Sequence, residues 1–212
     1  MITRKLLSRR ALVMLLTAVV ASACTGNSPG VSLSSTSKEV QAMNVGSKMV
    51  PPASSFTTAP LRNRIRVEFK APVSEVWALI GNLTRFPEYS SGLERVETKE
   101  DLSGRCTEYV CYFKPQEEGG ESIVERELVR WYEPNRGYAS SGEEGNAFGV
   151  KNDLNLVILE PSKGGTILTW DEYYDAQDLD MMKAHFDQAF ADIAENLIRR
   201  FGGAVVTRYV DR

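Results

Sequence analysis

The sequence predicts an α+β fold in which an antiparallel sheet packs against helices. A first strand-like segment is followed by two short helical segments, then by a succession of strand-like segments, and one long amphipathic helix closes the pattern. Strands that follow one another along the chain, with helices kept separate, are typical of antiparallel α+β domains. A chain of 212 residues is long enough for one domain with a sizeable core.

The N-terminal segment has the character of an export signal. Residues 1–23 place four basic residues and no acid around the start of an apolar run that is short for a membrane-spanning helix. The stretch SRRALV resembles a twin-arginine export motif, and ASAC at residues 21–24 resembles a bacterial lipobox in which Cys24 would be lipidated. Cleavage after Ala23 without lipidation is the alternative.

Residues 24–61 are expected to form a flexible tether, because Ser, Thr, Gly and Pro dominate and no apolar period persists. The sequence therefore predicts an exported protein, anchored through Cys24 on the outer side of the cytoplasmic membrane or in the periplasm. Removal of residues 1–23 changes the net charge from −3 to −3 − 4 = −7. Such an acidic protein is not expected to bind nucleic acid, and we expect a monomer.

The folded domain is expected over residues 62–203 and begins with an alternating strand at 62–71. Apolar residues at helical spacing follow Pro72 and predict a short helix that ends at Gly81-Asn82. Its apolar stripe comprises Val73, Val76, Trp77 and Ile80. A second short helix is expected from Leu83 to Pro87, and Trp77 is expected to pack where the two helices meet.

Six further strand-like segments and one long helix complete the domain. The segments are LERVETKE (93–100), RCTEYVCYF (105–113), SIVERELVRWY (122–132), GYASSG (137–142), DLNLVILEP (153–161) and TILTWDEYYD (166–175). The helix, at 178–201, carries its apolar residues three and four apart. Gly202-Gly203 is expected to end it, and residues 204–212 are expected to be a C-terminal tail.

This order of elements resembles the START/Bet v 1-like superfamily, which includes the polyketide cyclase/dehydrase and lipid-transport proteins. The resemblance rests on VEFKAPVSEVWALIGNLTRFPEY, VERELVRWYEPNRGY, GGTILTWDEYYD and the closing helix, and it covers about residues 62–203. It implies a helix-grip fold, in which a curved antiparallel sheet of about six or seven strands wraps around the long C-terminal helix. It also implies a cavity between the two for a hydrophobic small molecule or lipid.

The resemblance further implies that Glu125, in the ER pair before the EPNR turn, faces this cavity and that Asp171 joins it from the last strand. Alternation alone does not decide which strand face is inward. Two surface acids that form exposed pairs with Arg126 or Arg130 are therefore the alternative. The remaining residues expected to line the cavity are Tyr173, Met182, Phe186, Phe190 and Ile193.

Two acidic, glycine-containing segments, 114–121 and 142–149, are expected at the mouth of the cavity. The alternative is that both are solvated turns. The residues expected to shape the mouth are Pro115, Gly119, Gly120 and Phe148.

The sequence carries no motif for a metal or cofactor, and we expect neither. The single histidine, His185, is interpreted as a solvent-edge residue of the closing helix, because a lone histidine needs a partner to bind metal or act as a base. Cys106 and Cys111 lie on one predicted strand, roughly 16 Å apart, which is beyond disulfide reach.

Two classes of function fit these observations. The first is a cell-envelope protein that binds a hydrophobic small molecule or lipid in its cavity. The second is a cyclase/dehydrase-like enzyme that uses Glu125 or Asp171 as general acid or base. Binding is favoured over catalysis because the sequence shows no second titratable partner. This fold hosts both classes, and a filled core without a ligand is the third possibility.

Overall fold

The structure is a computed structural model that describes residues 49–115, 120–143, 146 and 148–211. The predicted export signal, the lipobox with Cys24 and most of the predicted tether lie outside the described residues. Gly119, one of the expected mouth residues, also lies outside them.

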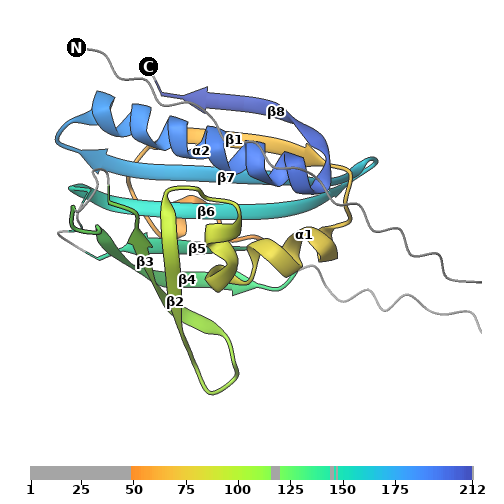
Figure 1. Cartoon of the computed structure of the whole chain (residues 1–212), viewed down its shortest axis with the longest axis horizontal. Helices are drawn as coiled ribbons and strands as arrows, with labels where there is room; N and C mark the ends of the chain where they lie inside the picture. Colours follow the sequence, from red (N-terminus) through yellow and green to blue (C-terminus); the bar gives the residue numbers. More distant parts are fainter. Residues whose placement is uncertain (1–48, 116–119, 144–145, 147, 212) are drawn as a thin grey trace, which may run out of the picture. The chain divides into compact units, whose positions relative to one another are not determined.

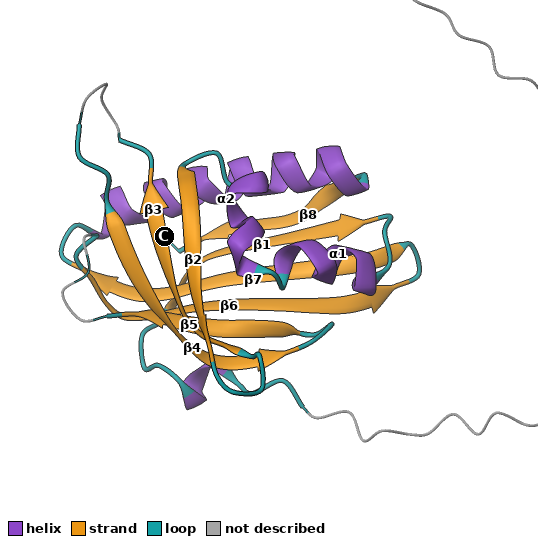
Figure 2. Ribbon diagram, turned by 60° about the horizontal axis from the view of Figure 1, so that its bottom comes forward, coloured by secondary structure: helices purple, strands orange, loops and turns teal. Residues whose placement is uncertain are grey.

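The described part contains one antiparallel sheet of eight strands in the order β2-β3-β4-β5-β6-β7-β1-β8 (Figure 1). The strands are β1 (Leu61–Phe69), β2 (Leu93–Glu100), β3 (Cys106–Phe113), β4 (Val124–Glu133), β5 (Gly137–Gly142), β6 (Val150–Ser162), β7 (Gly165–Ala176) and β8 (Gly203–Val210). Figure 2 shows that the sheet twists and curves from β2 to β8. It does not close into a barrel, since β2 and β8 remain its edges.

The helices pack on one face of this sheet. They are α1 (Val73–Ile80), the 3-10 helix η2 (Leu83–Glu88) and α2 (Leu179–Phe201), while a short 3-10 turn, η1 (Ala53–Ser55), precedes β1. The carboxylate of Asp178 caps α2 by accepting a hydrogen bond from the Met181 N–H. The predicted α+β helix-grip architecture, with two short helices after the first strand, is confirmed.

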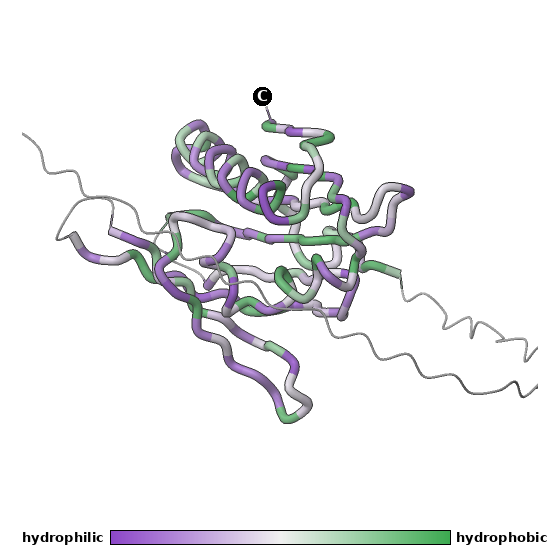
Figure 3. Tube along the Cα trace, turned by 45° about the vertical axis from the view of Figure 1, so that its right-hand side comes forward, coloured by the Kyte–Doolittle hydropathy of each residue, from purple (hydrophilic) through white to green (hydrophobic). Residues whose placement is uncertain are grey.

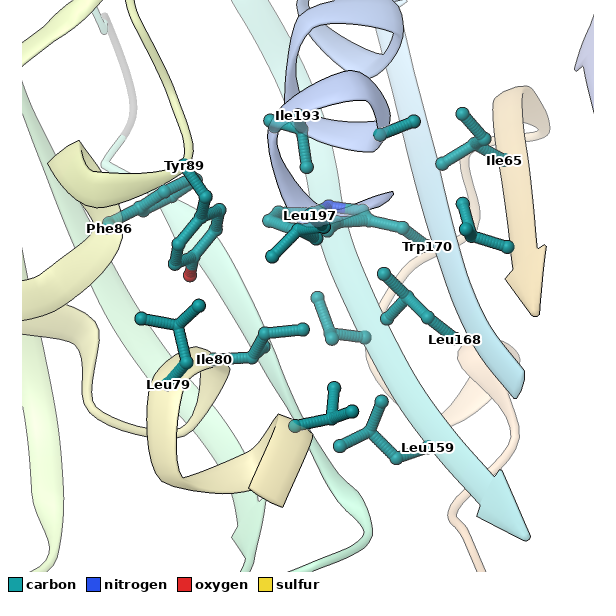
Figure 4. Close-up of a cluster of buried hydrophobic side chains, with 14 of the residues drawn as sticks. Ile65, Leu79, Ile80, Phe86, Tyr89, Leu159, Leu168, Trp170, Ile193 and Leu197 are labelled. Atoms are coloured by element: carbon teal, nitrogen blue, oxygen red, sulfur yellow. The ribbon is translucent and has the colours of Figure 1, made fainter. Parts of the chain in front are cut away.

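The core lies between α2, the inner face of the sheet and the two short helices. Figure 4 shows α1 and η2 contributing Leu79, Ile80 and Phe86 to the same cluster that Leu197 of α2 enters. Trp170 of β7 is 1% exposed, and its ring lies 5.6 Å from Phe86 and 6.0 Å from Phe190. Full burial of each large apolar side chain contributes about 1.5–3 kcal/mol, so this cluster holds the helices to the sheet.

The long helix is amphipathic, as its sequence pattern predicts. Hydrophilic and hydrophobic residues are mixed along its whole length in Figure 3. Phe190, Ile193 and Leu197 are buried against the sheet. The opposite face carries charged residues such as Glu195 and Arg199, which form an exposed pair.

The predicted C-terminal tail is wrong, because residues 203–210 form β8 and pair with β1. Gly202 and Gly203, both with positive φ, turn the chain from α2 back along the sheet. A Cβ on Gly203 would lie only 1.9 Å from the Glu68 carbonyl oxygen, so this close approach requires glycine. Nearly every β8 residue is exposed, and the segment therefore has no buried face that its sequence could reveal.

The ordered fold also begins before residue 62, inside the predicted tether. Phe56 packs on a small cluster formed by Ala139, Leu154 and Leu156. The Thr57 hydroxyl donates a hydrogen bond to the Asn152 carbonyl. The local composition of this segment predicts a linker, whereas its contacts come from strands distant in sequence.

Trp77 lies where α1 meets η2, and it packs against Gly81 and Tyr132. The Trp77 and Tyr132 rings are 5.2 Å apart, and the Tyr132 hydroxyl donates to the Gly81 carbonyl at 2.9 Å. Cys106 and Cys111 are free thiols, as the sequence predicts.

We expect Gly81→Ala to lower the free energy of unfolding by about 1–3 kcal/mol. A Cβ at this position would lie 2.3 Å from the Trp77 ring, which must then move away from Tyr132. The backbone itself suits alanine, since Gly81 has φ −72°. Urea unfolding followed by tryptophan fluorescence measures the change.

Gly92→Ala is the matched control, because nothing lies within 4 Å of its Cβ position. Its free energy of unfolding should stay within about 0.5 kcal/mol of the wild-type value. Equal destabilisation by the two substitutions would show that the Trp77 contact is not the cause.

Candidate functional site

A cavity of about 120 Å³ lies between α2 and the strands β3, β4, β6 and β7. Much of its wall is apolar and aromatic. Phe86 comes from η2, Trp170 from β7, and Phe190 and Ile193 from α2. The predicted contribution of the closing helix to such a cavity is therefore found at Phe186, Phe190 and Ile193.

Three rings contact one another in the wall of the cavity. Phe148 lies 5.2 Å from Phe113 of β3 and 5.2 Å from the imidazole of His185 on α2. All three residues line the cavity. Phe148, one of the expected mouth residues, thus lines the cavity, and His185 is exposed on α2, as the sequence predicts, and also contributes to the cavity wall. Burial lowers the pKa of His185.

Four carboxylates enter the same wall: Glu125 and Glu127 of β4, Asp153 of β6 and Glu172 of β7. Sheet register brings them together, since Glu127 pairs with Gly142 of β5, and Asn155 of β6 pairs with Glu172. Glu125 and Glu127 are two residues apart on one strand, so they point to the same face. The cavity consequently has an apolar helix side and an acidic sheet side.

Glu125 is buried, with 6% of its surface exposed. Its Oε2 accepts no hydrogen bond from any residue in the described ranges. Desolvation raises the pKa of Glu125 to about 7, and the nearby Asp153 carboxylate contributes in the same direction. Near neutral pH this carboxyl is therefore divided between its protonated and its ionised form.

The pKa values of Glu127 and Glu172 are raised more strongly than that of Glu125. Burial raises the pKa of each well above its ordinary value, and Asp153 adds to the effect on both. The Glu127 carboxyl also raises the pKa of Glu172, and Glu125 raises that of Glu127. In the described part of the chain, Oε2 of Glu127 has no hydrogen-bond partner. Like charges buried together cannot all ionise, so protons are retained in this group.

Asp153 is the best satisfied of the four. Its Oδ2 accepts a hydrogen bond of 2.7 Å from the Gly142 N–H. Burial still raises its pKa, although this hydrogen bond and the Arg130 charge oppose the shift. A Cβ on Gly142 would lie 3.2 Å from Asp153 Oδ2 and 3.3 Å from Glu125 Oε1, so both carboxylates converge on this glycine.

The expectation that Asp171 and Tyr173 line the cavity is corrected. Asp171 is buried on the opposite face of β7, where Arg64 of β1 donates two hydrogen bonds to its carboxylate. The Tyr173 hydroxyl lies 3.4 Å from Asp171 Oδ2 on that face. Glu172 shares the inward face of β7 with Trp170, which is buried and also lines the cavity.

Met182 also lies apart from the cavity wall. It is buried in a separate cluster with Val150 and Tyr174, and Phe186 packs against that cluster. Pro115 and Gly120 are not among the residues that line the cavity. The helix stripe thus serves two clusters, because α2 is longer than the cavity.

The described ranges contain neither a metal-ligand cluster nor a helix suited to spanning a membrane. No cluster there of three or more His, Cys, Asp or Glu side chains is arranged to hold a metal ion. Within the same ranges, no helix has the length and apolar character needed to cross a membrane.

The sequence matches one described protein family over most of its length. The family model described as "Polyketide cyclase / dehydrase and lipid transport" matches residues 61–202 of the 212-residue chain. No curated protein matches the sequence.

Solved structures share the fold at low sequence identity. A START superfamily protein from Mycobacterium smegmatis is 14% identical, with TM-score 0.56, over 67% of this chain and 97% of that chain. The Zhui aromatase/cyclase from a Streptomyces species is 15% identical, with TM-score 0.53, over 66% of this chain and 93% of that chain. The protein XoxI from Bacillus cereus is 18% identical, with TM-score 0.51, over 66% of this chain and 95% of that chain.

The raised pKa of Glu125 predicts how stability changes with pH. The folded state binds this proton more tightly than the unfolded state, so the contribution is complete below pH 4.5 and is lost as pH rises through about 7. We expect Glu125→Gln to match the wild type at about pH 5. At about pH 8 it should be more stable by about 1–2 kcal/mol, after allowance for solvent screening.

Urea unfolding at the two pH values checks this expectation. Glu160→Gln is the control, since Glu160 is exposed on β6 outside the cavity, and its stability should follow the wild type at both values. An identical pH dependence in Glu125→Gln and wild type would contradict the assignment of a buried, protonated carboxyl.

Proposed function

The chain belongs to the polyketide cyclase/dehydrase and lipid transport family, and from that membership we propose that it binds a small, largely apolar molecule between α2 and the sheet. The observation that carries this proposal is the cavity itself, with aromatic walls and carboxylate oxygens that have no protein partner within the described residues. Apolar walls provide affinity, and a few convergent polar groups orient the ligand.

The size of the cavity narrows the choice of ligand. At about 120 Å³ it is smaller than the roughly 300–1,000 Å³ of sites for drug-sized ligands. A compact molecule of one or two rings suits this space. A lipid with two acyl chains would require Phe113, Phe148 and His185 to separate at the mouth.

Catalysis is the second candidate, and the pKa of Glu125 favours it. A carboxyl with a pKa of about 7 is well matched to general acid–base catalysis at neutral pH. The aromatase/cyclase named above shares the fold, which hosts binding proteins and enzymes alike. In such an enzyme, Glu125→Gln would bind its substrate without converting it.

Binding is tested with 2-naphthalenemethanol, a neutral two-ring alcohol, followed by its fluorescence. We expect saturable binding by the wild type and at least about tenfold weaker binding by Ala189→Leu. Ala189 lines the cavity, and the larger side chain would fill it.

Ala184→Leu is the control, because it places the same side chain on the exposed face of the same helix. This variant should bind as the wild type does. Absence of saturable binding by the wild type would contradict the proposal and favour a filled core.

We also propose that the domain is exported and anchored at the cell envelope through a lipid on Cys24. Support comes from the ASAC sequence and the Ser/Thr/Gly/Pro-rich segment that follows it. The wild type expressed in a bacterial host should enter the detergent phase of a Triton X-114 separation. Cys24→Ser should remain unprocessed or move to the aqueous phase. Recovery of mature wild type in the aqueous phase would contradict the anchor.

A further inference from the structure

Four carboxylates form the acidic side of the cavity. Among the described residues, no Lys or Arg lines the cavity beside the four carboxylates. Arg130, whose charge acts on Glu127 and Asp153, is an exposed residue that donates its Nε–H to the Ser141 hydroxyl. Within the described ranges, His185 is therefore the one basic side chain in the cavity wall, and no Lys or Arg there neutralises these carboxylates.

Two of the carboxylates are almost completely removed from water. Glu125 is 6% exposed and Glu172 is 7% exposed. Oε2 of Glu125 and Oε2 of Glu127 accept no hydrogen bond from the part of the chain that the structure describes. Unpaired buried carboxylates lower stability, so their retention in a cavity wall points to a ligand that supplies donors and charge.

Resting on the ligand-binding function proposed above, we propose that the cavity takes an organic cation, a compact apolar body with a protonated amine held by Glu125, Glu127 and Glu172. An ammonium group has donors and no acceptor, which suits these oxygens. Phe86, Trp170 and Phe190 line the same cavity, and the π-face of an aromatic ring attracts a cation.

Other ligand classes fit the wall less well. A metal ion lacks a suitable cluster in the described ranges. An anion would meet four carboxylates and no Lys or Arg side chain from those ranges. A neutral ligand would leave the carboxyls protonated and would gain no charge-assisted hydrogen bond.

Binding of an ammonium is coupled to proton release. Burial raises the pKa of Glu125 to about 7, so the free protein holds protons that a cation displaces to solvent. Affinity for the amine should therefore rise between about pH 6 and about pH 8. The titratable and charged groups around the site are Tyr109 and Cys111 of β3, Glu125, Glu127 and Arg130 of β4, Tyr138 of β5, Asp153 of β6, Glu172 of β7 and His185 of α2.

The neighbouring tyrosines and Cys111 differ from His185 in their protonation between about pH 6 and about pH 8. Burial raises the pKa values of Tyr109, Cys111 and Tyr138, so these residues stay protonated throughout. His185 has a lowered pKa and contributes protons at the acidic end. His185→Asn therefore separates its contribution from that of the carboxyls.

The test compares three probes with one ring system: 2-naphthylmethylamine, 2-naphthalenemethanol and 2-naphthoate. Calorimetric titration in buffers of different ionisation enthalpy measures both affinity and proton release. We expect the amine to bind at least about tenfold more tightly than the alcohol, and the carboxylate to bind most weakly. Proton release should accompany amine binding in the wild type and in His185→Asn.

Variants locate the effect. Glu125→Gln combined with Glu127→Gln should remove most of the difference in affinity between the amine and the alcohol, while saturable alcohol binding remains. The alcohol result also reports that the double variant is folded. If that variant does not fold, Glu172→Gln alone should lower amine affinity several-fold. Glu160→Gln should leave the affinities for the amine and the alcohol unchanged.

Equal affinity for amine and alcohol, or amine binding without proton release, would overturn the cation proposal while leaving the ligand-binding function intact. Failure of all three probes to bind would overturn both.

Discussion

Packing of the apolar face of α2 against the curved sheet is the contact on which the rest of the structure depends. Leu197, Ile193 and Phe190 of α2 meet Trp170 and its neighbours on the inner face of the sheet. A strongly curved sheet contacts a straight helix closely over part of its length. The end with α1 and η2 is filled by Leu79, Ile80 and Phe86, and the cavity lies on the side of Phe113 and Phe148.

Stability and function oppose each other on the inner face of the sheet. Strands β4, β6 and β7 place carboxyls where a well-packed protein of this class would place aliphatic side chains. Each buried carboxyl disfavours the folded state at neutral pH, because its ionised form is poorly solvated. The burial of Trp170, Phe190 and the residues around them offsets that cost. Such an exchange is expected at sites that bind or react.

The fold itself leaves the choice between binding and catalysis open, and the chemistry of the wall decides it. A protonated carboxyl at neutral pH is able to donate a proton, accept one after ionisation, or hold a cation. Donating and accepting a proton both require a pKa close to the working pH. The burial of Glu125 beside Asp153 meets that requirement, since both raise its pKa to about 7.

The sequence by itself determined the class of fold, because apolar periodicity reveals each element that has one buried face. Thus the alternation of β1 and the three-and-four spacing of α2 were sufficient. Tertiary structure decided whatever depends on a partner distant in the chain. Strand β8 has no buried face, and its pairing with β1 is visible only in three dimensions.

The dependence on distant partners also explains why the sequence did not decide which carboxyl of β7 enters the cavity. Alternation places Asp171 and Glu172 on opposite faces of β7, but it does not say which face meets α2. The position of Arg64 on the neighbouring strand holds Asp171 outside and leaves Glu172 in the cavity, because a carboxylate is stabilised where its counter-ion lies.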